Sequence, residues 1–243
     1  MSDSTATDQP AEGDTAPVRQ YRFTAPPGAC DLLLIRHGES QPVVPGQPVP
    51  TTPDGQSDPP LAPEGEAEAL RVADRLAGEE ISAIYTTTLQ RTKQTAAPLA
   101  ERLGLPLREE SDLREVFLGD WDGGEYRLRV AAGDPLINDM VTEQDWGVIP
   151  NAESYDTFAT RVRAGIERIA ANHPDQRVVA VVHGGVIGMA LHLASGSGRF
   201  TFVASANASL NHLVITRDHW ILRRFNDTGH LATDLDKPVQ QLI

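Results

Sequence analysis

Two histidines in this chain directly follow apolar, β-prone segments, and a glycine follows each of them. His37 comes after the segment 32–35 and Arg36, and His183 comes after the segment 178–182. Short continuous apolar runs are typical of buried parallel strands, and ligands of open α/β sheets bind beyond the carboxyl ends of such strands. If the two segments are neighbouring central strands, two imidazoles and one guanidinium meet in one pocket. That combination suits the chemistry of a phosphate group.

The glycines after the histidines favour the same interpretation. Gly38 allows a ligand to approach the backbone closely, and Gly184 opens a predicted helix whose free N–H groups and dipole favour an anion. A lone histidine in either place would more often be structural. The pairing of His37 with His183 is what predicts a site.

Two further segments carry side chains that could serve this site. Arg91 lies in the first turns of a helix predicted over 87–103, directly after a predicted strand, so it can reach the same sheet edge. Glu115 lies among bulky apolar residues, and a carboxyl beside Phe117 and Trp121 would be desolvated and more easily protonated, as a general acid requires. Taken alone, either residue would more simply be an ordinary surface position.

Strand and helix signals alternate along most of the chain. Strands are predicted at 32–35, 81–85, around 107, and at 177–182, 200–205, 211–216 and 220–225. Helices are predicted at 64–76, 87–103 and 155–169 and after His183, with Pro98 expected to kink or weaken the second of them. This alternation predicts an α/β fold, a three-layer sandwich with a mostly parallel central sheet flanked by helices.

Composition divides the chain into a tail and one domain. Residues 1–27 are rich in Ser, Thr, Asp, Ala and Pro, and we expect a disordered N-terminal tail. Residues 28–243 are predicted to form a single domain. A Pro-rich loop at 41–63 and a partly helical insertion at about 124–150 interrupt it. The insertion has an acidic bias, which would disfavour highly anionic substrates.

The overall charge restricts the partners. With a formal net charge of -13, we expect no nucleic acid and no anionic membrane as partner, because both bind basic patches. No basic, apolar leader begins the sequence, so we expect a cytoplasmic protein. The only cysteine, Cys30, excludes an intrachain disulfide and is expected to be a buried core residue.

Several segments, in order between Asp31 and Ser209, together resemble the histidine phosphatase superfamily, specifically its phosphoglycerate-mutase-like branch. They are residues 36–38, 58–69, 87–96, 115–123, 151–154 and 183–184. The resemblance implies a histidine acid phosphatase-like phosphomonoesterase that is metal-independent, needs no cofactor and acts on a small phosphorylated metabolite. It leaves open whether the protein forms a homodimer.

The resemblance also implies a role for each candidate residue. His37 would be the nucleophile that forms a phosphohistidine, and Glu115 would protonate the leaving oxygen and then activate water. The phosphate-binding residues would be Arg36, Arg91, His183 and Gly184.

One position departs from the family pattern. An asparagine often follows the nucleophile by six residues, and this chain has Val43 there, inside the Pro-rich loop. This departure disfavours, but leaves open, a mutase-type phosphotransferase that returns the phosphoryl group to a sugar acid. A second alternative is a non-catalytic protein of the same fold that binds a phosphorylated ligand.

Overall fold

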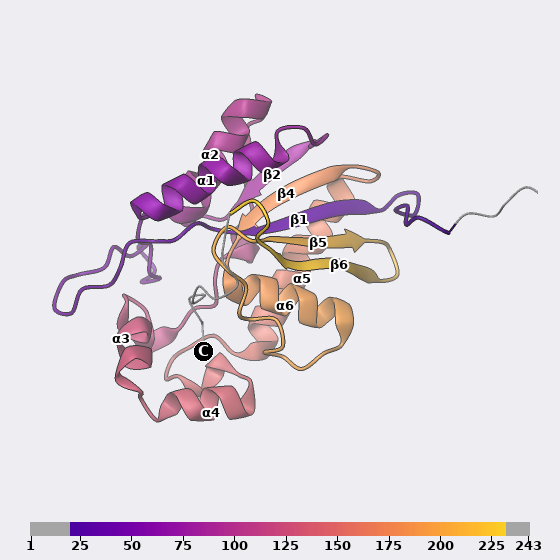
Figure 1. Cartoon of the computed structure of the whole chain (residues 1–243). Helices are drawn as coiled ribbons and strands as arrows, with labels where there is room; N and C mark the ends of the chain where they lie inside the picture. Colours follow the sequence, from indigo (N-terminus) through magenta and orange to yellow (C-terminus); the bar gives the residue numbers. More distant parts are fainter. Residues whose placement is uncertain (1–19, 232–243) are drawn as a thin grey trace, which may run out of the picture.

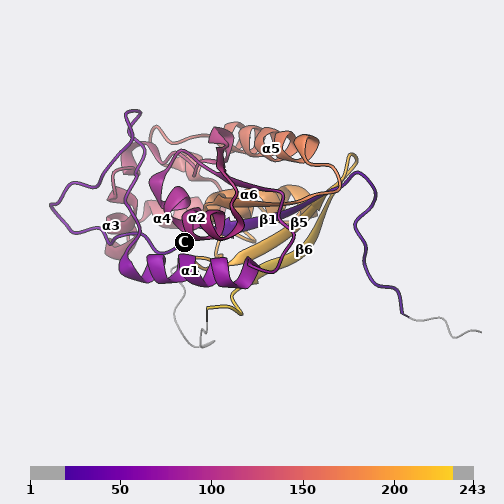
Figure 2. The same cartoon turned by 90° about the horizontal axis from the view of Figure 1, so that it is seen from above.

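The computed structural model describes residues 20–231. Within them a sheet lies between two layers of helices (Figures 1 and 2). The strands are β1 (Cys30–Arg36), β2 (Ala83–Thr86), β3 (Leu107–Glu109), β4 (Arg177–Val182), β5 (Leu210–Ile215) and β6 (Trp220–Asp227). The helices are α1 (Pro63–Leu76), α2 (Gln90–Leu103), α3 (Glu125–Ala132), α4 (Leu136–Glu143), α5 (Tyr155–Asn172) and α6 (Gly184–Ser195). Short 3₁₀ helices are η1 (Ser111–Leu113), η2 (Gly119–Trp121) and η3 (Trp146–Val148).

The sheet is mostly parallel, as predicted. Its strand order is β3-β2-β4-β1-β5-β6. The neighbours from β3 to β1 pair in parallel, whereas β5 and β6 pair antiparallel at the other side. β1 and β4 are therefore adjacent central strands.

Alternating residues of β1 face two separate cores. Leu32 and Leu34 pack into the apolar cluster that includes α5 and α6. Leu33 and Ile35 pack into the cluster formed with α1 and α2. Because side chains alternate across a strand, this pattern requires a helical layer on each face. The predicted three-layer sandwich is confirmed, and Figure 2 shows α1 and α5 on opposite sides of the sheet.

One predicted strand is wrong. Residues 200–205 form turns and irregular backbone instead of pairing with the sheet. Their apolar side chains have other partners: the Phe200 ring lies 4.4 Å from that of Trp146. Val203 lies against Gly188 of α6, where an added Cβ would come within 2.9 Å of a Val203 methyl. The apolar, β-prone composition of this segment thus reflects packing on α6 and on the insertion.

The second helix differs from its prediction at its start. α2 begins at Gln90 and not at Thr87, because the Thr87 hydroxyl accepts a hydrogen bond from the Leu89 backbone N–H at 3.2 Å and holds a turn there. The helix continues through Pro98 to Leu103 without interruption.

The predicted domain boundary remains untested. Residues 1–19 of the expected tail lie outside the described residues, as do residues 232–243. The Pro-rich loop 41–63 is closed by isolated bridges between Ser40 and Leu61 and between Thr51 and Ser57. The insertion holds α3, α4 and η3. In the part of the chain from residue 20 to 231, no helix has the length and apolarity needed to cross a membrane.

Two glycines bring α1 against the end of β1. A Cβ on Gly65 would lie 2.1 Å from the carbonyl oxygen of Glu39, and one on Gly38 would lie 2.5 Å from the carbonyl oxygen of Gly65. Only glycine allows two backbones to approach so closely. The start of α1 therefore fixes the segment that follows the first strand.

We expect Gly65→Ala to destabilise the fold by about 1–3 kcal/mol, because the methyl group meets rigid backbone. Chemical denaturation measures the loss. Gly78→Ala is the matched control, since a Cβ at Gly78 meets nothing within 4 Å. Equal stabilities of the two variants would contradict the close approach.

Candidate active site

The parallel pairing of β1 and β4 places the two predicted histidines side by side. Arg36 is paired with Val182 in the ladder, so the residues that follow them, His37 and His183, leave the sheet at the same level. Their ring centroids lie 5.2 Å apart in an edge-to-face arrangement. The His37 backbone N–H also donates to the Val182 carbonyl at 2.9 Å, which fixes the backbone of the first histidine to the second strand.

Two hydrogen bonds define the tautomer of His37. Nδ1 lies 2.7 Å from the Gly38 carbonyl oxygen, which can only accept, so Nδ1 carries the proton. Nε2 receives the Arg91 Nε–H at 3.2 Å, so Nε2 carries the lone pair. Burial, and then the charges of Arg91 and Arg36, hold the pKa of His37 well below its ordinary value. The ring is thus a neutral imidazole whose Nε2 is available for attack.

Two arginines surround this imidazole, and carbonyl oxygens hold both of them. Arg36 donates to the Ser205 carbonyl, and its Nε is buried without a partner within residues 20–231. Arg91 donates from Nη1 to the Ser57 carbonyl at 3.0 Å and forms a long ion pair with Asp58, at 3.9 Å. Burial lowers the pKa of each arginine to about 10, so both stay charged at neutral pH. This arrangement leaves their positive charge available to an anionic ligand.

His183 is the more enclosed histidine. Its Nε2 lies 3.0 Å from the Thr87 hydroxyl, and its Nδ1 is buried without a hydrogen-bond partner among the described residues. Burial, and then the charge of Arg91, hold the pKa of His183 well below its ordinary value. Gly184, the first residue of α6, is buried directly after it. A buried unpaired nitrogen beside two arginines is a place for a ligand atom.

Glu115 is held by the N-terminus of α6. Its Oε2 accepts the Gly185 backbone N–H at 3.1 Å, and its Oε1 accepts that of Val116 at 3.0 Å. A Cβ on Gly185 would lie 2.4 Å from Oε1, so glycine is required for the carboxyl group to reach this place. The second histidine and the candidate acid are therefore held by the same helix start.

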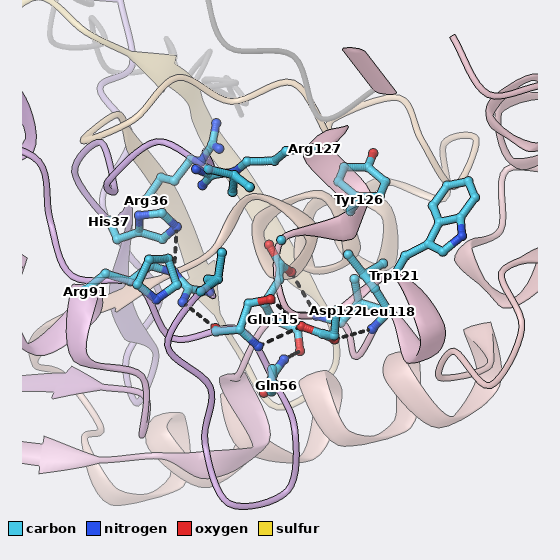
Figure 3. A pocket seen from close by; sticks show the side chains of 16 residues that line it. Arg36, His37, Gln56, Arg91, Glu115, Leu118, Trp121, Asp122, Tyr126 and Arg127 are labelled. Carbon is cyan, nitrogen blue, oxygen red and sulfur yellow. Dashed lines mark hydrogen bonds between the residues drawn. The ribbon is translucent and has the colours of Figure 1, made fainter. Parts of the chain in front are cut away.

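These side chains line a cleft (Figure 3). The cleft brings together Arg36, His37, Arg91 and Glu115, and the predicted His183 and Gly184 are buried beside them, with the His183 ring 5.2 Å from that of His37. The sequence prediction placed Phe117 and Trp121 beside Glu115. Trp121 lines the cleft, but Val116 and Tyr126 take the place of Phe117.

The Pro-rich loop forms one wall of the cleft and is fastened to the acid segment. The Gln56 amide donates to the Glu115 carbonyl at 2.8 Å. Both the backbone N–H and the hydroxyl of Ser57 donate to Asp122 at 2.7 Å. Val43, at the position of the family asparagine, contributes only methyl groups to the wall. The loop is thus a built part of the site.

The insertion, whose sequence has an acidic bias, also contributes a cation to the cleft. Two of its acids are paired away from the cleft: Asp134 with Arg129 at 2.8 Å and Asp145 with Arg199 at 3.4 Å. Arg127 of α3 lines the cleft. Sequence reasoning missed Arg127, as it missed Gln56, because nothing local distinguishes Arg127 from Arg129 on the same helix.

Within residues 20–231, no group of three or more His, Cys, Asp or Glu side chains is arranged to hold a metal ion.

We expect Gly185→Ala to lower kcat by about tenfold or more, because the methyl group displaces the Glu115 carboxyl group from its seat. Alanine normally stabilises a helix relative to glycine, so a general loss of fold is not the expected cause. Melting temperature and kcat are measured on the same preparation. Full activity in this variant would show that the seat of Glu115 has no bearing on turnover.

At about pH 6, where an ordinary histidine is largely protonated, we expect His37 to remain neutral with its proton on Nδ1. Long-range ¹H–¹⁵N NMR distinguishes the two ring nitrogens, and His37→Ala assigns the signals. A His37 ring that titrates with the ordinary value would contradict the environment described above.

Comparisons with known proteins agree with this arrangement. The family model of the histidine phosphatase superfamily (branch 1) matches residues 32–228. A metal-independent phosphoserine phosphatase of Arabidopsis thaliana is 30% identical over 210 residues, which cover 84% of each chain. The uncharacterized phosphatase PhoE of Bacillus subtilis is 26% identical over 202 residues, which cover 83% of this chain and 96% of PhoE.

Solved structures show the same fold. A mycobacterial glucosyl-3-phosphoglycerate phosphatase superposes with a TM-score of 0.67 and 28% identity, covering 82% of this chain and all of that one (100%). YhfR of Bacillus stearothermophilus superposes with a TM-score of 0.68 at 24% identity, covering 83% of this chain and 99% of the other. The chain belongs to the histidine phosphatase superfamily, as a phosphatase of its phosphoglycerate-mutase-like branch.

Proposed function

We propose that this chain is a metal-independent, histidine acid phosphatase-like phosphomonoesterase that acts on a small phosphorylated metabolite through a phosphohistidine. The observation that carries the proposal is the state of His37. Its neutral ring has a lone pair on Nε2 and lies between Arg36 and Arg91 in the cleft that Glu115 also lines. Several relatives named as phosphatases support the same class of reaction.

In the first step, the lone pair on Nε2 of His37 forms a bond to phosphorus while the bond from phosphorus to the ester oxygen breaks. Protonated Glu115 gives its proton to that oxygen, so the alcohol leaves neutral. Arg36, Arg91 and His183 stabilise the charge on the transferring phosphoryl group. The phosphoryl group then resides on His37, and Glu115 is a carboxylate.

In the second step, that carboxylate takes a proton from a water molecule whose oxygen attacks phosphorus. The bond from phosphorus to Nε2 breaks, phosphate leaves, and His37 is neutral again. The N–H groups of Gly185 and Val116 hold the carboxylate during this half of the cycle. The arginines supply the positive charge that a metal ion supplies in other phosphatases, so no metal is required. The cytoplasmic location stays a prediction from the sequence.

We expect His37→Ala to lower phosphate release from a chromogenic phosphomonoester by at least about a thousandfold, because it removes the nucleophile. The assay contains a chelator throughout, since activity is expected to survive it. Rapid quenching of the unaltered chain into alkali should trap a phosphohistidine, which the variant lacks.

His219→Ala is the matched control, because His219 is an exposed histidine outside the cleft. Near-normal turnover in His37→Ala would contradict the mechanism. Saturable phosphate binding without turnover on any ester would instead favour a non-catalytic binding protein. Interconversion of phosphoglycerates without phosphate release would favour a mutase.

A further inference from the structure

Arg127 is a third arginine in the cleft, and the mechanism above gives it no role. It lies on α3, and its side chain reaches from that helix towards Arg36 and His37 (Figure 3). Its Nη1 donates to the Gln41 carbonyl at 3.0 Å, and its Nη2 donates to the Ser40 hydroxyl at 2.7 Å. The guanidinium is thus fixed to the segment that follows the nucleophile.

Within residues 20–231, the charge of Arg127 has no direct counter-ion, and the Glu39 carboxylate acts on it only from a distance. Among the described residues, no carboxylate lies within the 4.0 Å that defines an ion pair with it. Its two bonds go to neutral oxygens, so three of the five N–H donors of an arginine remain for a ligand. Burial lowers the pKa of Arg127 more than the charge of Glu39 raises it. A half-buried charge that has no direct ionic partner among the described residues is costly unless a ligand neutralises it.

Apolar side chains make up much of the cleft wall. Val43 and Val49 of the Pro-rich loop line it, as do Leu118, Trp121 and Tyr126 of the acid segment and insertion. Gly124 lets α3 lie against the loop, since a Cβ there would meet a Val49 methyl at 2.6 Å. The apolar part of the cleft wall suits the part of the substrate beyond the phosphoryl group.

We propose that Arg127 determines substrate specificity by binding a carboxylate on the leaving group, so that the preferred substrates are small phosphomonoesters of hydroxy acids. The inference rests on the proposed function. Arg36 and Arg91 already match the charge of a phosphate dianion close to His37. A planar guanidinium binds a carboxylate through two parallel hydrogen bonds.

Two matched pairs of esters test the inference. O-phosphoserine is compared with O-phosphoethanolamine, and 3-phosphoglycerate with glycerol 3-phosphate; in each pair the second ester lacks the carboxylate. We expect the unaltered chain to prefer the carboxylated ester in kcat/KM, and we expect Arg127→Gln to reduce that preference ratio by about tenfold or more. Arg127→Lys should restore part of it, because the charge returns without the planar fork.

Arg102→Gln is the control, because Arg102 is a surface arginine on α2 that pairs with Asp74. It should leave the preference ratio of the unaltered chain in place. An equal loss for both esters of a pair in Arg127→Gln would overturn the inference, since it would place Arg127 on the phosphoryl group or in a structural role. So would an unaltered chain that shows no preference.

Calorimetric Kd values for the same four esters separate this inference from the proposed function, because binding needs no turnover. Tighter binding of the carboxylated esters that depends on Arg127, with hydrolysis of none, would support the inference and contradict the phosphatase. Suppose instead that the esters are hydrolysed but that, in each pair, both bind with similar Kd values to the unaltered chain and to Arg127→Gln. That result would support the phosphatase and contradict the inference.

Discussion

The site depends on the parallel pairing of β1 with β4. The ladder sets Arg36 opposite Val182, and it continues one step further through the bond from the His37 N–H to the Val182 carbonyl. A slip of one residue would turn every side chain of β1 to the other face of the sheet and would separate the two imidazoles. Because each face of β1 packs into its own apolar core, the register is fixed by burial, and the positions of the histidines follow from it.

The second requirement is positive charge that remains available. Arg161 illustrates the structural alternative: its Nε and Nη2 are bound by the two Glu153 oxygens at 2.6 and 2.7 Å, which neutralises it. Arg36 donates to the Ser205 carbonyl and Arg91 to the Ser57 carbonyl, and Arg91 has only a long ion pair, with Asp58 at 3.9 Å. A carbonyl group orients a guanidinium without cancelling its charge. The pairing of an arginine therefore distinguishes a structural role from a binding role in a chain whose net charge is -13.

The sequence predicted the parts of the site that belong to single elements. His37 and His183 were assigned to the site because each follows a predicted strand, and Arg91 because it lies near the start of a predicted helix. Local sequence pattern determines where such elements begin and end. Arg127 and Gln56 could not be found this way. Arg127 and Arg129 lie two positions apart on α3, and Arg129 is bound by Glu125 and Asp134. Only the packing of α3 on the loop decides which of them reaches the cleft. The strand prediction for residues 200–205 was wrong for the same reason, because the apolar residues of this segment make tertiary contacts outside the sheet.

The Pro-rich loop is held to the acid segment and to α3 by hydrogen bonds that do not involve Nε2 of His37. Arg127 is bound to Ser40 and Gln41, a few residues after His37, and Asp122 of the acid segment is bound to Ser57 of the loop. The tautomer of His37, in contrast, is fixed by Gly38 and Arg91. Changes in the loop tip or in α3 can therefore alter the wall that meets the leaving group while the nucleophile keeps its hydrogen bonds. A fold built in this way can accept new substrates without rebuilding its chemistry, because specificity is carried by loops on a rigid scaffold.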